Sequence, residues 1–124
     1  MPLAKIMVGV PTYARTYSLV VPIPGGQAQP MNAPASGPGL GNGKLNYSAV
    51  CRFLRLPGAA RHFDVAAQVP YASREYDWVA YENEMSVAIK AQWVVKTGMG
   101  GVVTFALNFD DAAGKNYQDG ITKM

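Results

Sequence analysis

The sequence predicts an α/β fold in which two parallel strands, one near each end of the chain, are joined through a helix and an oversized insertion. Nearly continuous apolar runs occupy Lys5–Tyr13 and Gly100–Phe109, and a helical pattern over Glu84–Thr97 leads directly into the second run. Such runs are typical of strands buried on both faces, and parallel strands need a crossover connection. Two strands alone leave open edges and uncovered faces, so the pattern also predicts that the fold is incomplete.

The first strand is expected to end at Pro11, which cannot donate a ladder hydrogen bond. The helix has Asn83 or Ser86 available as its N-cap and Gly98 suited to the left-handed position after its last turn. Its apolar residues at helical spacing are Met85, Ala88, Ile89 and Trp93.

The segment between the first strand and this helix is far longer than the usual loop of about 2–6 residues, which indicates an inserted unit. Its part from Val20 to Gly43 holds five prolines and six glycines and cannot form a regular element. Asn46 can cap a short helix that ends at Pro57-Gly58, with apolar side chains on one side: Leu45, Ala49, Val50, Phe53 and Leu54. Strand-like pieces follow at Ala66–Ala72 and Asp77–Tyr81, separated by a polar turn at 73–75. The insertion is therefore predicted to be a small α+β module.

Composition excludes several classes of function. The formal charge of +3 comes from 11 basic and 8 acidic residues without a run of like charge, which argues against nucleic-acid binding. No apolar stretch approaches the roughly 18 residues of a membrane span. Lys5 interrupts the apolar N-terminus, where no small-residue cleavage site follows, so no signal peptide is expected. With one histidine (His62) and one cysteine (Cys51), neither a metal site nor a cofactor site is predicted.

The string Lys5-Ile-Met-Val-Gly-Val-Pro-Thr-Tyr-Ala-Arg15 closely resembles the seventh barrel strand of family 18 glycoside hydrolases, the chitinases and chitinase-like lectins, whose pattern is K-x-x-x-G-x-P-x-Y-G-R. Further matches follow in the same order and cover essentially the whole chain: Gly43–Tyr47, Val50-Cys51, Val69–Tyr71, Asp77–Val79, Gly100-Gly101, Ala106-Leu107, Asp110-Asp111 and Gly114. The resemblance implies part of a (β/α)₈ TIM barrel. Residues 1–16 would be the seventh strand, 17–82 an α+β insertion domain walling a chitin-binding groove, and 83–124 the seventh helix, the eighth strand and the start of the last helix.

In this family the substrate's own acetamido group acts as the nucleophile. By resemblance, the protein supplies a D-x-x-D-x-D-x-E motif after the fourth strand and a tyrosine after the sixth, both N-terminal to the part represented here. The acidic motif does not occur in these 124 residues, so no catalytic residue is expected and the chain is predicted to be inactive by itself. The expected partners are chitin or N-acetylglucosamine oligomers and the missing N-terminal barrel portion, in an extracellular parent protein.

Three residues are predicted to bind the sugar. Tyr13 and Arg15 lie at the C-terminal end of a strand, where barrel enzymes place their sites, and they offer a stacking ring and fixed hydrogen-bond donors. Phe105 stands where relatives usually have a tryptophan beneath the reacting sugar. The alternative is that Tyr13 belongs to the core and Arg15 forms an ion pair with Asp110 or Asp111.

The chain also departs from the family pattern. Ala14 replaces the usual glycine, Ala49 replaces an acidic residue, and Tyr117 stands where a partner for Cys51 is common, which would leave a free, buried thiol. Asp110 and Asp111 are adjacent, so they cannot flank one glycosidic bond and are expected to cap the following turn.

Two questions stay open at this point. The aromatic side chains Tyr71, Tyr76, Trp78 and Tyr81 form either a sugar platform or the core of the insertion. The alternatives to a chitinase-like function are a stand-alone lectin-like or protein-interaction module, and a truncated product without a function of its own.

Overall fold

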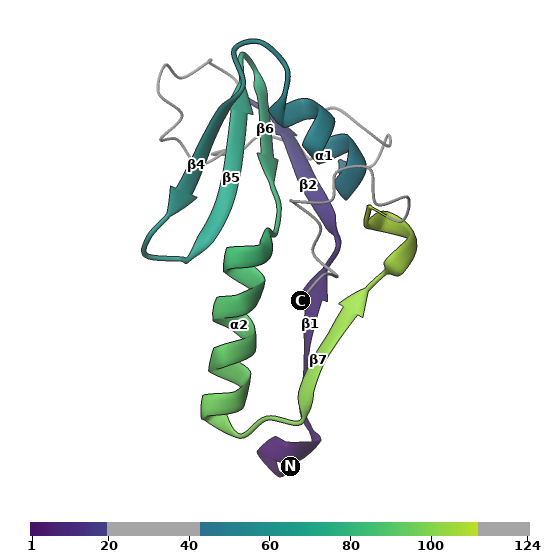
Figure 1. Ribbon diagram of the computed structural model, residues 1–124, viewed down its shortest axis with the longest axis vertical. Helices are drawn as coiled ribbons and strands as arrows, with labels where there is room; N and C mark the ends of the chain where they lie inside the picture. The colour runs from purple at the N-terminus through teal and green to yellow at the C-terminus, as the bar shows by residue number, and fades with distance from the viewer. Residues whose placement is uncertain (20–42, 112–124) are drawn as a thin grey trace.

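The computed structural model describes residues 1–19 and 43–111 (Figure 1). The predicted irregular stretch, Val20–Gly43, lies outside these residues except for Gly43. The expected start of the last helix, with Tyr117 and Gly114, also lies outside them.

Two strands from opposite ends of the chain pair in parallel, as predicted. After a short 3₁₀ turn, η1 (Leu3–Lys5), strand β1 (Met7–Pro11) lies beside β7 (Gly101–Phe105). The register runs from Met7 opposite Gly101 to Pro11 opposite Phe105. A second short 3₁₀ turn, η2 (Leu107–Phe109), follows β7.

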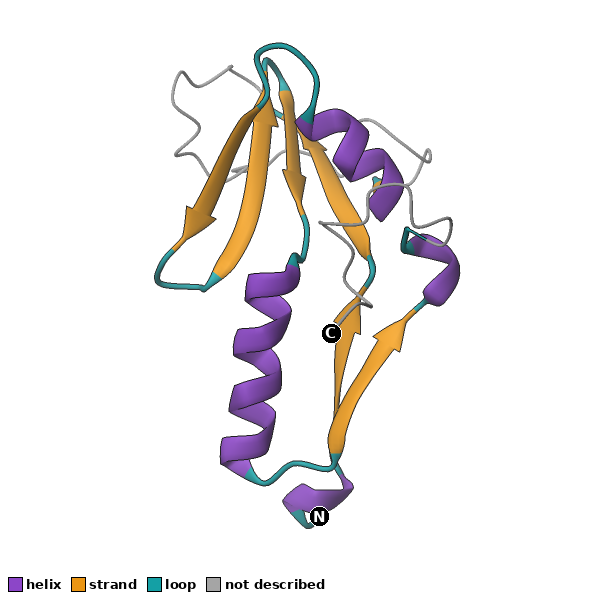
Figure 2. Cartoon of the chain, in the orientation of Figure 1, coloured by secondary structure: helices purple, strands orange, loops and turns teal. Residues whose placement is uncertain are grey.

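The inserted unit contains a five-stranded antiparallel sheet in the order β3-β2-β6-β5-β4 (Figure 2). Its strands are β2 (Tyr13–Ser18), β3 (Lys44–Asn46), β4 (Ala60–Asp64), β5 (Val69–Arg74) and β6 (Asp77–Ala80). Only β5 and β6 were predicted, and β5 was placed three residues too early. Strand β2 follows β1 after the single residue Thr12, so Tyr13–Ser18 pairs within this sheet rather than with β7.

Local hydrogen bonds explain the shifted start of β5. Residues 65–68 form a turn, in which the Asp64 side chain accepts a hydrogen bond from the Ala67 backbone at 2.9 Å and Gln68 has a φ of 57°. The predicted polar turn falls instead at Glu75-Tyr76. Directly after this turn, burial raises the pKa of the Asp77 carboxyl. The nearby Arg74 lowers this pKa and Glu75 raises it further.

Helix α1 (Tyr47–Leu54) begins at the predicted cap and ends at Leu54, three residues before the predicted Pro57-Gly58. The Asn46 side chain accepts a hydrogen bond from the Ala49 backbone at 2.9 Å, which satisfies an otherwise unpaired donor of the first turn. The buried side chains of α1 are Tyr47, Val50, Cys51, Phe53 and Leu54. They pack on the sheet face that carries Ala14, Leu45, Ala72 and Val79.

Helix α2 (Glu84–Thr97) has the predicted bounds and the predicted ends. Asn83 and Ser86 form a reciprocal capping box, and Gly98 takes the left-handed conformation with a φ of 75°. The predicted apolar side is wrong, because Met85 and Trp93 are 58% and 51% exposed. The buried residues are Ser86, Val87 and Val94, on the side that faces β7 and the insertion.

The β1–β7 sheet is covered on one face only. Alternate residues of a strand share a face, so Val10 and Val102 lie on the face that packs against the core. The other face leaves Met7, Val103 and Phe105 49–63% exposed. The prediction of strands buried on both faces is therefore wrong for the described residues, and the predicted uncovered face is present.

One hydrophobic core joins the two parts of the structure. Its cluster contains Val10 of β1, Val87 of α2, Tyr81 between β6 and α2, and the apolar residues beneath α1. The sheet of the insertion is thereby fixed relative to the end of β1.

Removing the cap of α2 tests how far this helix depends on its first turn. Asn83→Ala deletes the acceptor for the Ser86 backbone, and we expect it to lower the free energy of unfolding by about 1 kcal/mol in urea denaturation. Gln92→Ala, an exposed change within the same helix, is the control. Equal stability of the two variants would contradict the role assigned to the cap.

Candidate functional site

A pocket of about 220 Å³ lies where β1 passes into β2. Its lining comes from β1 and β2, from the start of β5, and from the end of β6 with the residues that follow it. The lining residues are Pro11, Tyr13, Arg15, Val69, Pro70, Ala80, Tyr81 and Glu82. The structure thus brings Tyr13 and Arg15, two of the three predicted site residues, into one pocket.

Tyr13 is half-buried and held by contacts on several sides. Its ring meets the ring of Phe109 edge-on, with centroids 5.8 Å apart. The Arg15 guanidinium lies 5.5 Å and the Lys44 ammonium 4.9 Å from the Tyr13 centroid. Tyr13 is therefore surrounded by cationic groups, which aromatic rings attract.

Phe105, the third predicted residue, lies at the end of β7 opposite Pro11 and is 63% exposed. It is not among the residues that line the pocket. The buried Thr12 connects Phe105 to the pocket residues that follow β1. Its backbone N–H donates to the Phe105 carbonyl at 3.0 Å, and its hydroxyl donates to the Ala106 carbonyl at 2.5 Å. The ends of β1 and β7 are tied together at the point where Tyr13 begins β2.

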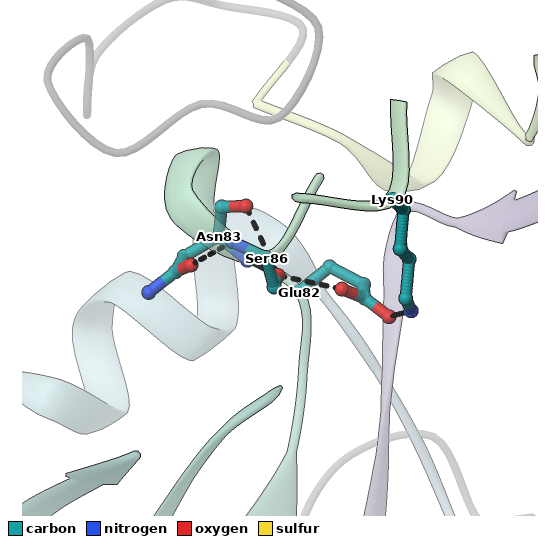
Figure 3. A network of polar contacts seen from close by, with 4 residues as sticks. All are labelled: Glu82, Asn83, Ser86 and Lys90. Carbon is teal, nitrogen blue, oxygen red and sulfur yellow. Dashed lines mark hydrogen bonds and ion pairs between the residues drawn. The ribbon is translucent and has the colours of Figure 1, made fainter. Parts of the chain in front are cut away.

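Glu82 contributes a buried carboxylate to the pocket wall (Figure 3). The side chain is 8% exposed, accepts a hydrogen bond from the Ser86 hydroxyl at 2.6 Å, and forms an ion pair with Lys90 of α2. Ser86 also belongs to the capping box with Asn83. The network fixes the start of α2 against the pocket, and Lys90 neutralises the negative charge of Glu82.

The two adjacent aspartates do not form the alternative ion pair. Within residues 1–19 and 43–111, no ion pair joins Arg15 to Asp110 or Asp111. Asp111 accepts a hydrogen bond from the Ser48 hydroxyl at 3.1 Å, and its backbone N–H donates to the Asp110 side chain at 2.8 Å. These contacts connect the start of α1 to the segment after β7.

The aromatic residues of the insertion have separate roles. Tyr81 is part of the core, and Tyr76 is exposed in the turn before β6. On the sheet, Tyr71 stacks between His62 and Trp78, with centroids 4.8 Å and 5.5 Å away. Stacked neighbours occupy both ring faces of Tyr71, so this row presents ring edges rather than a flat platform, and the geometry favours packing.

Sequence reasoning missed Glu82, which lines the pocket, and Lys44, which lies beside the pocket next to the Tyr13 ring. Lys44 reaches Tyr13 only because β3 pairs with β2 in a register that places Lys44 opposite Arg15, and β3 itself was not predicted. Glu82 precedes the predicted helix and carries no motif. Its position before the Asn83 cap was the only available signal.

The parallel pair β1–β7 has a helix along one face, and an antiparallel sheet backed by a helix is inserted after β1. This is the arrangement of an α/β barrel protein with an inserted domain. The chain belongs to the glycosyl hydrolases family 18, whose model matches residues 1–110.

Chitinase-3-like protein 2 from Homo sapiens is 32% identical over 126 residues, which span 97% of this chain and 30% of that protein. The endochitinase of Brugia malayi is 31% identical over 94% of this chain and 23% of its own length. The chain thus spans less than a third of these relatives.

Solved structures agree in fold. Human YKL-39, described as a pseudo-chitinase with retained chitooligosaccharide binding, superposes with a TM-score of 0.81 and 28% identity, covering 98% of this chain and 34% of that one. A family 18 chitinase from Cycas revoluta, solved in complex with (GlcNAc)₃, superposes with a TM-score of 0.75 and 32% identity, covering 92% of this chain and 32% of that one.

Removing the partner of Glu82 tests the network at the pocket wall. Lys90→Met leaves a buried carboxylate unpaired, and because Lys90 is 32% exposed we expect a loss of about 1–3 kcal/mol in the free energy of unfolding. Lys96→Met, an exposed lysine of the same helix, is the control for lost charge. A loss no larger than that of the control would argue against the network.

Proposed function

We propose that this chain is the part of a family 18 barrel protein that carries one wall of a groove for chitin or N-acetylglucosamine oligomers. The observation that carries the proposal is the pocket at the C-terminal end of β1, lined by Tyr13 and Arg15. Proteins of this barrel class place their sites at that end of the strands. A tyrosine and a guanidinium supply the hydroxyl and the fixed donors that an oligosaccharide needs.

The rest of the barrel is proposed to cover the open face of the β1–β7 sheet. In a (β/α)₈ barrel one sheet face packs on helices and the other points into the barrel, where side chains fill the interior. The described residues show this asymmetry, because α2 and the core cover Val10 and Val102 while Met7, Val103 and Phe105 are exposed. We assign β1 to the seventh strand, the segment from β2 to residue 82 to the insertion, and 83–124 to the last helix-and-strand unit and the start of the final helix. The boundary predicted after residue 16 thereby moves to Thr12, because Tyr13–Ser18 pairs within the inserted sheet.

Hydrolysis is proposed to belong to segments outside this chain. Glu82 is the acidic residue among those that line the pocket, and its carboxylate is paired with Lys90 and hydrogen-bonded to Ser86. Because the relatives are chitinases and chitinase-like proteins, we further propose an extracellular parent protein. No helix of the described residues is both long and apolar enough to cross a membrane.

Oligosaccharide binding by the 124-residue chain tests the recognition role. We expect the N-acetylglucosamine tetramer to bind in calorimetry, and Tyr13→Ala and Arg15→Ala to weaken it by about tenfold each, equivalent to ~1.4 kcal/mol. Arg61→Ala, an exposed arginine of the far edge strand β4, is the control. Equal binding by all four proteins would contradict the proposed groove.

The assignment of catalysis elsewhere is tested with a fluorogenic chitobiose. The purified chain should release the fluorophore no faster than buffer. Release well above buffer that persists through purification would show that the chain supplies its own proton donor.

Amide hydrogen exchange separates this function from the alternative of a truncated product. A folded binding unit protects the amides of β2, β5 and β6, whereas a barrel remnant without a stable fold exchanges throughout. Protected strands without any binding of the tetramer would favour a protein-interaction module.

A further inference from the structure

Two cations face each other across neighbouring strands beside the pocket. Arg15 of β2 is directly opposite Lys44 of β3 in the antiparallel register. Directly opposed residues of such a pair share a sheet face, and like charges in this arrangement lower stability. Both groups lie over one ring, because Tyr13 is 5.5 Å from the Arg15 guanidinium and 4.9 Å from the Lys44 ammonium. The ring offsets part of the repulsion but carries no net charge.

No acidic side chain of the described residues neutralises this pair. The two ion pairs found there are Arg74–Glu75 and Lys90–Glu82. Glu82, the acid that shares the pocket lining with Arg15, is thus paired with Lys90. Residues 20–42, which connect β2 toward Lys44 in the sequence, contain neither aspartate nor glutamate.

We propose that Lys44 is a specificity-determining residue which, together with Arg15, makes this end of the groove favour glycans that carry negative charge over neutral ones and disfavour cationic ones. The inference rests on the proposed function, since it assumes that a glycan reaches the pocket. A carboxylate or sulfate on the sugar would supply the counter-charge that the described residues do not provide. A protonated amine would add a third positive charge.

Three tetramers with one backbone and different charge test this directly: the glucosamine tetramer, its N-acetyl form and its N-succinyl form, compared at about pH 6. We expect affinity to rise from cationic to neutral to anionic in steps of about threefold to tenfold, and the steps to shrink when salt is raised. Lys44→Gln should reduce each step. Lys44→Arg should restore steps of wild-type size.

Lys96→Gln removes the same charge from an exposed site at the far end of α2, and its ranking should match wild type. Affinity steps of wild-type size in Lys44→Gln would overturn the inference. So would an equal loss for all three tetramers, which would show that Lys44 merely positions Tyr13. If wild type binds the neutral tetramer without charge preference, the proposed function stands and this inference fails. If it binds the anionic tetramer alone, the inference stands and the proposed function fails.

Discussion

The structure depends on the bond between the ends of β1 and β7. Thr12 follows β1 directly, and its hydroxyl reaches the carbonyl of Ala106, 94 positions away in the sequence. Its backbone N–H continues the parallel ladder to Phe105. Because Tyr13 is the next residue, the same contact that closes the ladder also fixes where β2 leaves it. The direction in which the inserted sheet departs, and with it the pocket, follows from this one connection.

A shared core then prevents the inserted sheet from moving independently. Val10, the last buried residue of β1, lies in the same cluster as Tyr47 of α1 and Val87 of α2. On the opposite side of the pocket, Glu82 is bonded to Ser86 and Lys90, so the return of the chain from the sheet into α2 is also fixed. The chain is therefore fixed both where β1 leads into the insertion and where the insertion leads into α2, and residues at both points line the pocket. This arrangement limits the conformational entropy that a ligand would have to remove on binding.

The sequence predicted the elements whose signals are local. The parallel strand pair follows from two apolar runs, and both helices follow from Asn46 and Asn83 as caps, together with Gly98. Two of the three missed strands have no such signal: β3 is three residues long, and β4 mixes Arg61, His62 and Phe63 without alternation. The buried side of α2 was missed because Val87 belongs to a core cluster most of whose members lie far away in the sequence. Tyr13 and Arg15 were found from the motif that contains them. Lys44 lies in the matching segment Gly43–Tyr47, but only the pairing of β3 with β2 reveals that it stands opposite Arg15.

The stacking of the aromatic row bears on how the groove recognises its ligand. If Tyr71 and Trp78 had lain flat on the sheet, the insertion could have held a sugar polymer by apolar contact alone. They stand face to face, with ring planes 24° apart, so the ring faces between them are closed to a ligand. The Tyr13 ring is likewise in contact with other groups, because Arg15 and Lys44 lie over it and Phe109 meets it edge-on. Among the residues described around this pocket, polar and charged groups are thus better placed than free ring faces to discriminate between ligands. If the proposed function holds, we therefore expect this wall to distinguish glycans by their charge.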